Sequence, residues 1–260
     1  GNQVYIQPMV SLSYEDAEFV ELISKVNQIK AVPFYIVDSF GVMKQFDLMR
    51  LFYLVTNNLD QKIQLGYHSH NNLQMAFANA QTVVKAAETR DVIIDASIMG
   101  MGRGAGNLNT ELFIEHLNET KGSKYNIAPI LQAIDEVINR VYQLKGWGYS
   151  LPHYLSASWN CHPNYSTFLE GKNTLTVVDI NSILSKLEEE KRFHYDKAYI
   201  QKLYEQYQSH KVQDAKIMEE LEKKFQGKEI LLLAPGGSIL DEQEKIEMYI
   251  ETENPIVISV

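Results

Sequence analysis

The stretch LGYHSHNN at residues 65–72 decides how this chain folds. The apolar run from Ile63 to Tyr67 predicts a strand, and two histidines, His68 and His70, stand where that strand ends. Side chains alternate between the two faces of a strand, so both imidazoles are expected on the same side. Two neighbouring imidazoles can bind a divalent metal, although two half-buried histidines with hydrogen-bond partners would give the same pattern. A complete metal site would need further ligands, usually carboxylate oxygens and water.

Strand and helix patterns alternate on both sides of this stretch. We expect strands at residues 4–10, 32–37, 63–67 and 91–97, each followed by a helix, at 13–29, 46–56, 71–88 and 110–118. Strands that alternate with helices form a parallel sheet with covered faces. Ligands of such sheets bind at the carboxyl ends of the strands. The polar residues expected at that edge are Asp38, His68, His70 and Asn107.

Four strand–helix units fill half of a (β/α)8 barrel, which needs about 250 residues. Residues 1–122 therefore predict either the second half of such a barrel or a smaller open α/β sheet. The chain begins with Gly1 and reaches a strand pattern almost at once, and it finishes on another strand pattern at residues 256–260. We therefore expect these residues to be an internal part of a longer protein.

The rest of the chain predicts three further segments. Residues 123–190 form a helical segment after the barrel strands, residues 191–226 a helical linker, and residues 227–260 the start of a Rossmann-like βαβ unit. That last part places the apolar, buried strand 229–234 before a glycine-rich turn. The turn lacks both the Gly-Lys-Ser/Thr ending of a P-loop and the full G-x-G-x-x-G pattern, so it gives little support for nucleotide binding.

The composition is that of an ordinary soluble, globular protein. The 260 residues carry a formal net charge of −9, and no basic cluster of the kind that a nucleic-acid-binding protein needs stands out. The single cysteine, Cys161, excludes an intramolecular disulfide framework and fits a reducing cytoplasm. No apolar run reaches the ~18 residues of a membrane span, and no signal peptide is evident.

Several further positions have a functional and a structural interpretation. The glycine-rich loop 102–107 could hold an anion or simply turn the chain. Asp38, at a strand end, is typical of a residue that caps the next helix. Asp95, inside a predicted strand, indicates an internal polar anchor, and Cys161 with His162 indicates a structural pair.

Taken together, the motifs are more specific than any one of them. The segments VDSFG (37–41), GYHSHNNL (66–73), DAS (95–97) and GMGRGAGN (100–107) resemble the second half of the barrel in the HMG-CoA-lyase-like family, also called the DRE-TIM metallolyases. The branch they resemble most is that of 4-hydroxy-2-oxovalerate aldolase and related aldolases. The resemblance covers roughly residues 4–120.

The resemblance implies a role for each matched position. It implies that the four predicted strands are strands five to eight of a barrel. It also implies Mg²⁺ or Mn²⁺ as the cofactor. Asp38 would lie near the substrate as a catalytic residue, and Tyr149 would assist proton transfer. The implied metal ligands are His68, His70 and Asn107, and the implied substrate-binding residues are Ser39 and Arg103.

Two departures from the family pattern bear on function. The Asp-Arg-Glu-type motif of the first barrel strand is missing, and Arg103 to Gly106 replace the cysteine of the lyase loop. The second departure favours an aldolase of a 2-oxo acid over a CoA-ester lyase. We therefore expect a metal-dependent aldolase within a larger, homo-oligomeric, multidomain protein, with a 2-oxo acid and an aldehyde as its small-molecule partners. These residues alone are expected to be inactive.

Two alternatives remain open on the sequence. One is a Claisen-type acyl-CoA condensing enzyme of the same fold, in which the helical segment binds the acyl-CoA. The other is a non-catalytic scaffold or binding module within a multidomain protein.

Overall fold

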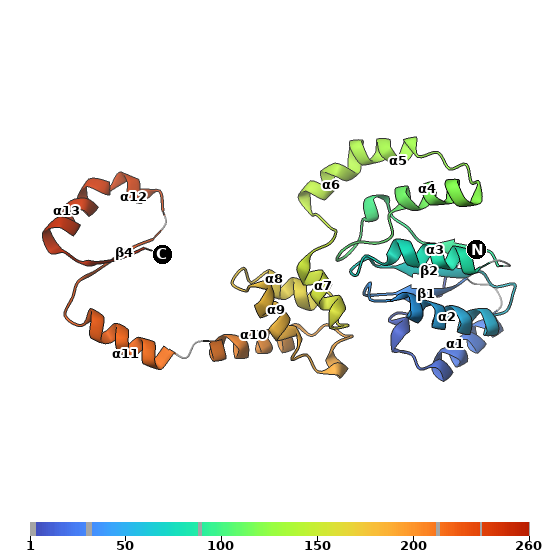
Figure 1. The fold of residues 1–260 in the computed structure, drawn as a ribbon, viewed down its shortest axis with the longest axis horizontal. Coiled ribbons are helices and arrows are strands. Elements are labelled where there is room, and N and C mark those ends of the chain that lie inside the picture. The colour runs from blue at the N-terminus through green and yellow to red at the C-terminus, as the bar shows by residue number, and fades with distance from the viewer. Residues whose placement is uncertain (1–3, 30–32, 88–89, 212–213, 235, 260) are drawn as a thin grey trace. The chain divides into compact units, whose positions relative to one another are not determined.

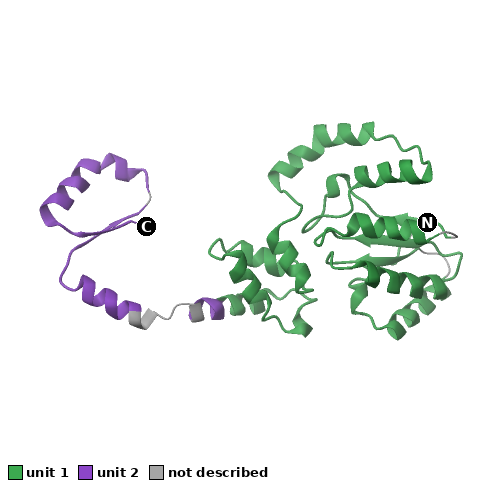
Figure 2. Ribbon diagram, viewed as in Figure 1, with its two compact units in different colours: residues 1–204 green, residues 205–260 purple. Residues whose placement is uncertain are grey.

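The computed structural model describes residues 4–29, 33–87, 90–211, 214–234 and 236–259 (Figure 1). The chain divides into two compact units, residues 1–204 and residues 205–260, called unit 1 and unit 2 (Figure 2). Some predicted element ends and part of a predicted turn lie outside the described residues, namely Val32, Glu88, Pro235 and Val260. Within the described residues no helix is both long enough and apolar enough to cross a bilayer.

Unit 1 contains a parallel three-stranded sheet in the order β1-β2-β3. The strands are β1 (Phe34–Asp38), β2 (Leu65–Ser69) and β3 (Val92–Ile94). In the register of the sheet, Tyr35 pairs with Gly66, and Gly66 pairs with Ile93. The predicted α/β architecture with parallel strands is thus confirmed. β3 is shorter than the predicted strand 91–97.

The first predicted strand, residues 4–10, is wrong. Only Ile6 pairs with the sheet, through one parallel bridge to Phe34. Pro8 has no N–H to donate to a ladder, and Val10 adopts a left-handed backbone conformation, with φ of 53°, before the short 3-10 helix Ser11–Ser13. These two features explain why the apolar pattern does not extend into a strand.

Four helices accompany the sheet: α1 (Asp16–Ile29), α2 (Gln45–Asn58), α3 (Ala76–Ala86) and α4 (Thr110–Lys121). Their apolar faces share one core with Phe34, Ile36, Leu65 and Tyr67 of the strands. Because side chains alternate along a strand, the intervening positions face away from this core. The face opposite the core therefore carries Tyr35, Gly66 and His68.

Two helices begin later than predicted. The chain turns between Asn71 and α3, because the Asn71 side chain accepts the backbone N–H of Ala76 at 3.1 Å and the Leu73 N–H is donated to the carbonyl of Gly41. The turn delays the helix to Ala76. Similarly, Ser13, predicted to cap a helix, lies in the short 3-10 helix before α1.

The remainder of unit 1 is helical, as predicted. A continuous helix runs through α5 (Ala128–Ala133), a π-helical turn (Ile134–Ile138) and α6 (Asn139–Leu144). It is followed by α7 (Leu151–Ser158), α8 (Asn164–Glu170), α9 (Val177–Leu184), the 3-10 turn Glu189–Lys191 and α10 (Lys197–Lys211). α9 ends six residues before the end of the predicted helical segment 123–190. The start of α10 belongs to unit 1, since Ile200 is fully buried.

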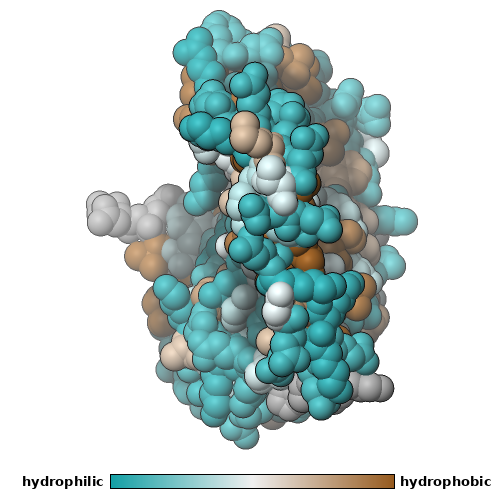
Figure 3. Space-filling model, turned by 90° about the vertical axis from the view of Figure 1, so that its left-hand side faces the viewer, coloured by the Kyte–Doolittle hydropathy of each residue, from teal (hydrophilic) through white to brown (hydrophobic). Residues whose placement is uncertain are grey.

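Unit 2 contains α11 (Asp214–Phe225) and a βαβ arrangement formed by β4 (Ile230–Leu233), α12 (Ser238–Asp241), α13 (Gln243–Glu253) and β5 (Ile256–Ser259). The two strands are parallel, as the predicted βαβ unit requires. The prediction that β4 is buried is wrong, because Ile230 and Leu232 are 46% and 62% exposed. A sheet of two strands leaves much of its apolar surface open. The face seen in Figure 3 is mostly hydrophilic, with hydrophobic side chains scattered among polar ones.

Candidate metal centre

The two histidines meet at the carboxyl end of β2. His68 is the fourth residue of the strand and points away from the helix-covered core, and His70 follows the strand by one residue. Their ring centroids are 5.4 Å apart, and the rings are nearly perpendicular. The structure therefore brings together the two residues that the sequence singled out first.

Asn107 lies beside this pair. Residues His70 and Asn107 form an antiparallel bridge, and the Asn71 N–H is donated to the carbonyl of Gly106 at 2.9 Å. The Asn107 amide nitrogen donates to the Met101 carbonyl at 3.2 Å. Its side-chain oxygen is buried and has no hydrogen-bond partner. A buried acceptor without a partner is costly, and a cation bound there would remove that cost.

The donor set suits part of a metal site. Two imidazoles and an amide oxygen are ligand types that bind divalent metals. Among the described residues, no group of three or more His, Cys, Asp or Glu side chains is arranged so that it could hold a metal ion by itself. His68, His70 and Asn107 therefore suit a divalent cation, but they form only part of a ligand set. A carboxylate from another part of the protein would complete it.

The glycine-rich loop is shaped around two asparagines. A Cβ atom added to Gly102 would come within 2.7 Å of the Asn107 amide, and one added to Gly104 within 2.8 Å of the Asn72 side chain. Asn72 is 1% exposed and accepts the backbone N–H of Ala105 at 2.8 Å. Sequence reasoning missed Asn72 as a residue that holds the site, although its place directly after the histidine motif is a usable signal.

Sequence reasoning named Asp95 only as an internal polar anchor within a strand, whereas the structure places it after the end of β3, beside the histidine pair. One of its carboxylate oxygens lies 3.1 Å from Nδ1 of His68. A cavity of about 350 Å³ opens here, lined by His68, Ile94, Asp95, Ala96 and Asn107. The expectation of an internal polar anchor described its contacts but not its position next to the histidine pair.

The surroundings favour a neutral imidazole at His70 and an ionised carboxylate at Asp95. Burial, with the nearby charges of His68 and Arg103, lowers the pKa of His70 to about 4, so its imidazole is neutral and can offer a lone pair. Burial raises the pKa of Asp95, but the hydrogen bond and charge of His68, together with the hydrogen bonds from Tyr35 and Gln7, outweigh this effect, and the net pKa lies below its ordinary range. Asp95 is therefore an anionic acceptor.

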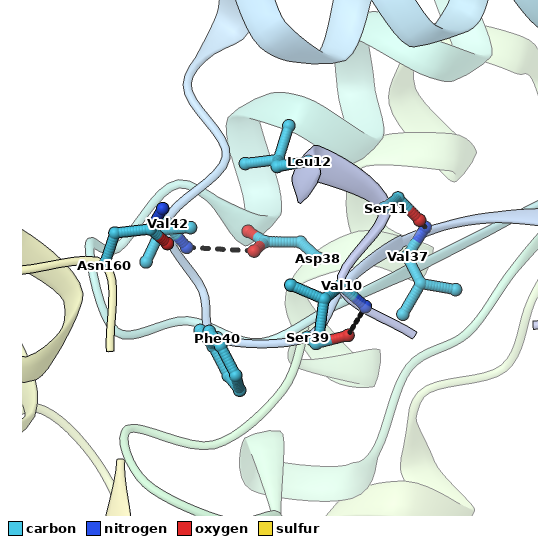
Figure 4. A pocket seen from close by; sticks show the side chains of 9 residues that line it. All are labelled: Val10, Ser11, Leu12, Val37, Asp38, Ser39, Phe40, Val42 and Asn160. Carbon is cyan, nitrogen blue, oxygen red and sulfur yellow. Dashed lines mark hydrogen bonds between the residues drawn. The ribbon is translucent and has the colours of Figure 1, made fainter. Parts of the chain in front are cut away.

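Asp38 and Ser39 bind the protein's own backbone in this structure. Asp38 is 2% exposed, and its two carboxylate oxygens accept the N–H groups of Val42 and Met43 at 2.9 and 3.0 Å. Ser39 accepts the N–H of Val10 at 2.8 Å. Figure 4 shows the contact of Asp38 with Val42 and that of Ser39 with Val10, beside a cavity of about 10 Å³ that has room for a single water molecule. Val42 and Met43 precede α2, whose N-cap is Lys44, so Asp38 holds the loop after β1 and the expectation that it caps the helix is wrong. A catalytic role for Asp38 and substrate binding by Ser39 stay predictions.

Arg103 and Tyr149 are both exposed. Arg103 lines a cavity of about 660 Å³ that the glycine-rich loop shares with Lys145 and Trp147. Tyr149 is 56% exposed, and its neighbour Gly148 donates its N–H to the Gly104 carbonyl at 3.4 Å. No contact among the described residues joins the Tyr149 side chain to the histidine pair. The structure thus places Tyr149 next to the loop, and Arg103 within the loop, close enough to His70 for its charge to lower the pKa of that imidazole.

Known proteins share this part of the chain. A 4-hydroxy-2-oxovalerate aldolase of Shewanella woodyi is 39% identical over 79 residues, which cover 30% of this chain and 22% of that protein. The aldolase of the same name from Geobacillus thermodenitrificans is 32% identical over 115 residues, covering 40% of this chain and 32% of the relative. The chain thus spans between about a fifth and a third of the length of these relatives.

A solved structure gives a longer match. It is that of "the N-terminal domain of a putative aldolase from Bacteroides vulgatus", with a TM-score of 0.57 and 29% identity, covering 69% of this chain and 56% of that one. The sequence profile of the HMGL-like family matches residues 1–140, more than half of the chain. The resemblance inferred from the motifs is thereby confirmed, and the chain belongs to the HMGL-like family.

Proposed function

We propose that this chain forms the carboxyl-terminal half of a (β/α)8 barrel in a divalent-metal-dependent aldolase. The enzyme would cleave or form a carbon–carbon bond next to a 2-oxo acid. A pyruvate-type 2-oxo acid and an aldehyde would be the products of cleavage and the substrates of bond formation. The observation that carries the proposal is the meeting of His68, His70 and the unpartnered oxygen of Asn107 at the carboxyl edge of a parallel sheet. In parallel α/β folds this edge is the usual place of a ligand site.

The chemistry divides between the cation and the chain. A bound Mg²⁺ or Mn²⁺ would act as a Lewis acid and stabilise the negative charge of an enolate. His68, His70 and Asn107 would hold the cation, and the lowered pKa of His70 keeps that imidazole free of a competing proton. Arg103 carries its positive charge close enough to depress the pKa of His70, so it can attract the carboxylate of a 2-oxo acid to the same edge.

Two residues remain candidates for proton transfer. Tyr149 directly follows Gly148, whose N–H is donated to the Gly104 carbonyl, so its segment is attached to the glycine-rich loop. Asp38 would need to release its backbone partners before it could serve as a base. We therefore assign the proton-transfer role to Tyr149 before Asp38.

The aldolase reaction is preferred to the acyl-CoA condensation. The relatives that match residues of this chain bear the name of an aldolase of a 4-hydroxy-2-oxo acid. Arg103 to Gly106 also occupy the loop position at which the lyase branch carries a cysteine. We propose further that the active protein is a cytoplasmic, homo-oligomeric, multidomain enzyme, in which other residues supply the missing ligand. Residues 1–260 alone are then inactive.

The test uses the natural protein that contains these residues. Release of the 2-oxo acid from a 4-hydroxy-2-oxo acid is followed with a coupled dehydrogenase, with Mn²⁺ or Mg²⁺ and after treatment with a chelator. We expect activity that the chelator abolishes and the metal restores, and a loss of at least 100-fold in His68→Ala and in His70→Ala.

His116 provides the matched control. It is a half-buried histidine on α4 that contacts Gln81, on the helix side of the sheet. His116→Ala should keep both metal binding and activity. Activity that survives chelation and the loss of both site histidines would overturn the proposal. Absence of bound metal together with absence of activity would favour the scaffold alternative.

A further inference from the structure

Four side chains from four separate segments converge next to the candidate metal centre. Tyr35 comes from β1, His68 from β2, and Asp95 from the loop that follows β3, while Gln7 lies in the extended segment before the first helix. Asp95 is the common partner of the other three. The ligand role proposed for His68 does not by itself account for these contacts of Asp95.

The contacts of Asp95 use both carboxylate oxygens. Oδ1 accepts the hydroxyl of Tyr35 at 3.2 Å. Oδ2 accepts the amide N–H of Gln7 at 3.2 Å and lies 3.1 Å from Nδ1 of His68. The backbone of Asp95 is also fixed, because its N–H is donated to the carbonyl of Tyr67 at 3.0 Å. The carboxylate therefore has a defined position relative to the His68 ring.

Gly66 makes the contact between Tyr35 and Asp95 possible. Tyr35 and Asp95 belong to segments on opposite sides of β2, and Tyr35 pairs across the sheet with Gly66. The Tyr35 ring lies over Gly66 so closely that an added Cβ atom would overlap ring atoms. Only a residue without a side chain leaves the ring room to cross β2 and reach the carboxylate.

The Tyr35 hydroxyl is a fixed donor. Tyr35 is 2% exposed, and burial together with the charge of Asp95 raises the pKa of its phenol. The phenol therefore keeps its proton and can only donate toward the carboxylate oxygen that it faces. This leaves Oδ2 of Asp95 directed to the imidazole of His68.

A neutral imidazole exists in two tautomers, and the partner of one nitrogen decides which nitrogen keeps a free lone pair. An anionic carboxylate at Nδ1 requires the proton there, which leaves Nε2 as the free acceptor. We propose that Asp95 is a positioning residue that holds His68 in the Nδ1-protonated tautomer with Nε2 available to a cation, and that Tyr35, lying across Gly66, holds Asp95 in place. This inference rests on the proposed metal site and deepens it.

The first test is made without metal. Long-range ¹H–¹⁵N spectra of the complete chain report the tautomer of His68 directly, and they do not depend on activity. We expect the Nδ1-protonated form to dominate in the parent chain and a mixture of tautomers in Asp95→Asn. Tyr35→Phe should shift the populations in the same direction by less. A parent chain with the His68 proton on Nε2 would overturn the proposal.

The second test titrates the natural protein that contains these residues with Mn²⁺ and measures its affinity for the metal. Loss of the partner of a metal-binding histidine typically weakens metal binding 10- to 100-fold, and we expect this for Asp95→Asn. Tyr35→Phe removes one neutral hydrogen bond and should weaken binding about two- to tenfold. Asp95→Glu should recover part of the loss, because it restores the charge. Unchanged affinity and unchanged tautomer in Asp95→Asn would contradict the proposal.

Asp91→Asn is the matched control. Asp91 is exposed, lies four residues before Asp95 on the same segment, and should leave the tautomer and the Mn²⁺ affinity as they are. The two tests also separate this inference from the proposed function. If the natural protein that contains these residues binds no Mn²⁺ while the His68 tautomer still depends on Asp95, the metal function is contradicted and the positioning role is supported.

Discussion

The side-chain oxygen of Asn72 accepts the backbone N–H of Ala105 at 2.8 Å. This one hydrogen bond joins the turn after the histidine motif to the glycine-rich loop that carries Asn107. The loop then returns to the strand edge through the contact between the Asn71 N–H and the Gly106 carbonyl. The candidate ligands from two separate segments are held together by these contacts, and the side chain of Asn72 makes one of them.

Asn72→Ala should therefore destabilise the chain. Asn72 is 1% exposed, and its loss would leave the Ala105 N–H buried without a partner, at a cost of about 1–3 kcal/mol. Urea unfolding followed by circular dichroism measures the change. Asn57→Ala, at an exposed position of α2, is the control and should change the free energy of unfolding by less than about 0.5 kcal/mol. Equal stability of the two variants would show that the hydrogen bond does not hold the loop.

Gly66→Ala should destabilise the sheet through the Tyr35 ring. The new Cβ atom would overlap that ring, and overpacking of a buried contact costs about 1–3 kcal/mol. The cost should shrink when the ring is absent, so the loss on Gly66→Ala is smaller in a Tyr35→Ala background. Such non-additivity is the signature of two groups in contact. Additive losses in the double-mutant cycle would mean that the ring is not the obstacle.

Gly171 supplies the control for this cycle. It lies at the end of α8 with a φ of −64°, and an added Cβ atom would meet its neighbours at ordinary contact distances of 3.4 Å or more. Gly171→Ala should therefore change stability little, with or without the Tyr35 ring.

Cys161 should be unreactive in the folded chain. Its side chain is fully buried, and burial raises the pKa of its thiol to about 12. At pH 8 on the order of one thiol in ten thousand is then ionised, and the thiolate is the reactive form. Iodoacetamide should label Cys161 only after unfolding, and raising the pH from 7 to 9 should leave the folded chain unlabelled. Rapid labelling under native conditions would contradict the buried position.

The position of the candidate ligands could be predicted from the sequence because strand ends in a parallel sheet share one edge. For His68 and His70 that rule and the alternation of side chains along β2 were enough, whereas Asn107 was expected at the edge and became a candidate ligand only through the resemblance to the family. The sequence pattern also indicated the helical nature of residues 128–144. Both predictions depend on short-range periodicity in the sequence, which is regular along β2 and over residues 128–144.

The contacts of Asp95 and Asp38 could not be predicted in this way. The hydrogen bond from Tyr35 to Asp95 depends on the register that sets Tyr35 opposite Gly66, and a pattern of apolar residues does not contain the register. The orientation of Asp38 depends on the loop after β1, whose N–H groups at Val42 and Met43 take up both its oxygens. A strand-end carboxylate looks the same in sequence whether it faces a substrate or its own loop.

Mn²⁺ should stabilise the complete natural protein against unfolding. A cation that binds the folded state alone stabilises it by about 2.7 kcal/mol at a concentration 100 times the dissociation constant. We expect the melting temperature to rise with Mn²⁺ concentration and to return to its starting value on chelation. His70→Ala should remove most of the rise, because it removes one of the proposed ligands, whereas His116→Ala should retain it. A rise of equal size in all three proteins would place the bound cation somewhere other than beside His68 and His70.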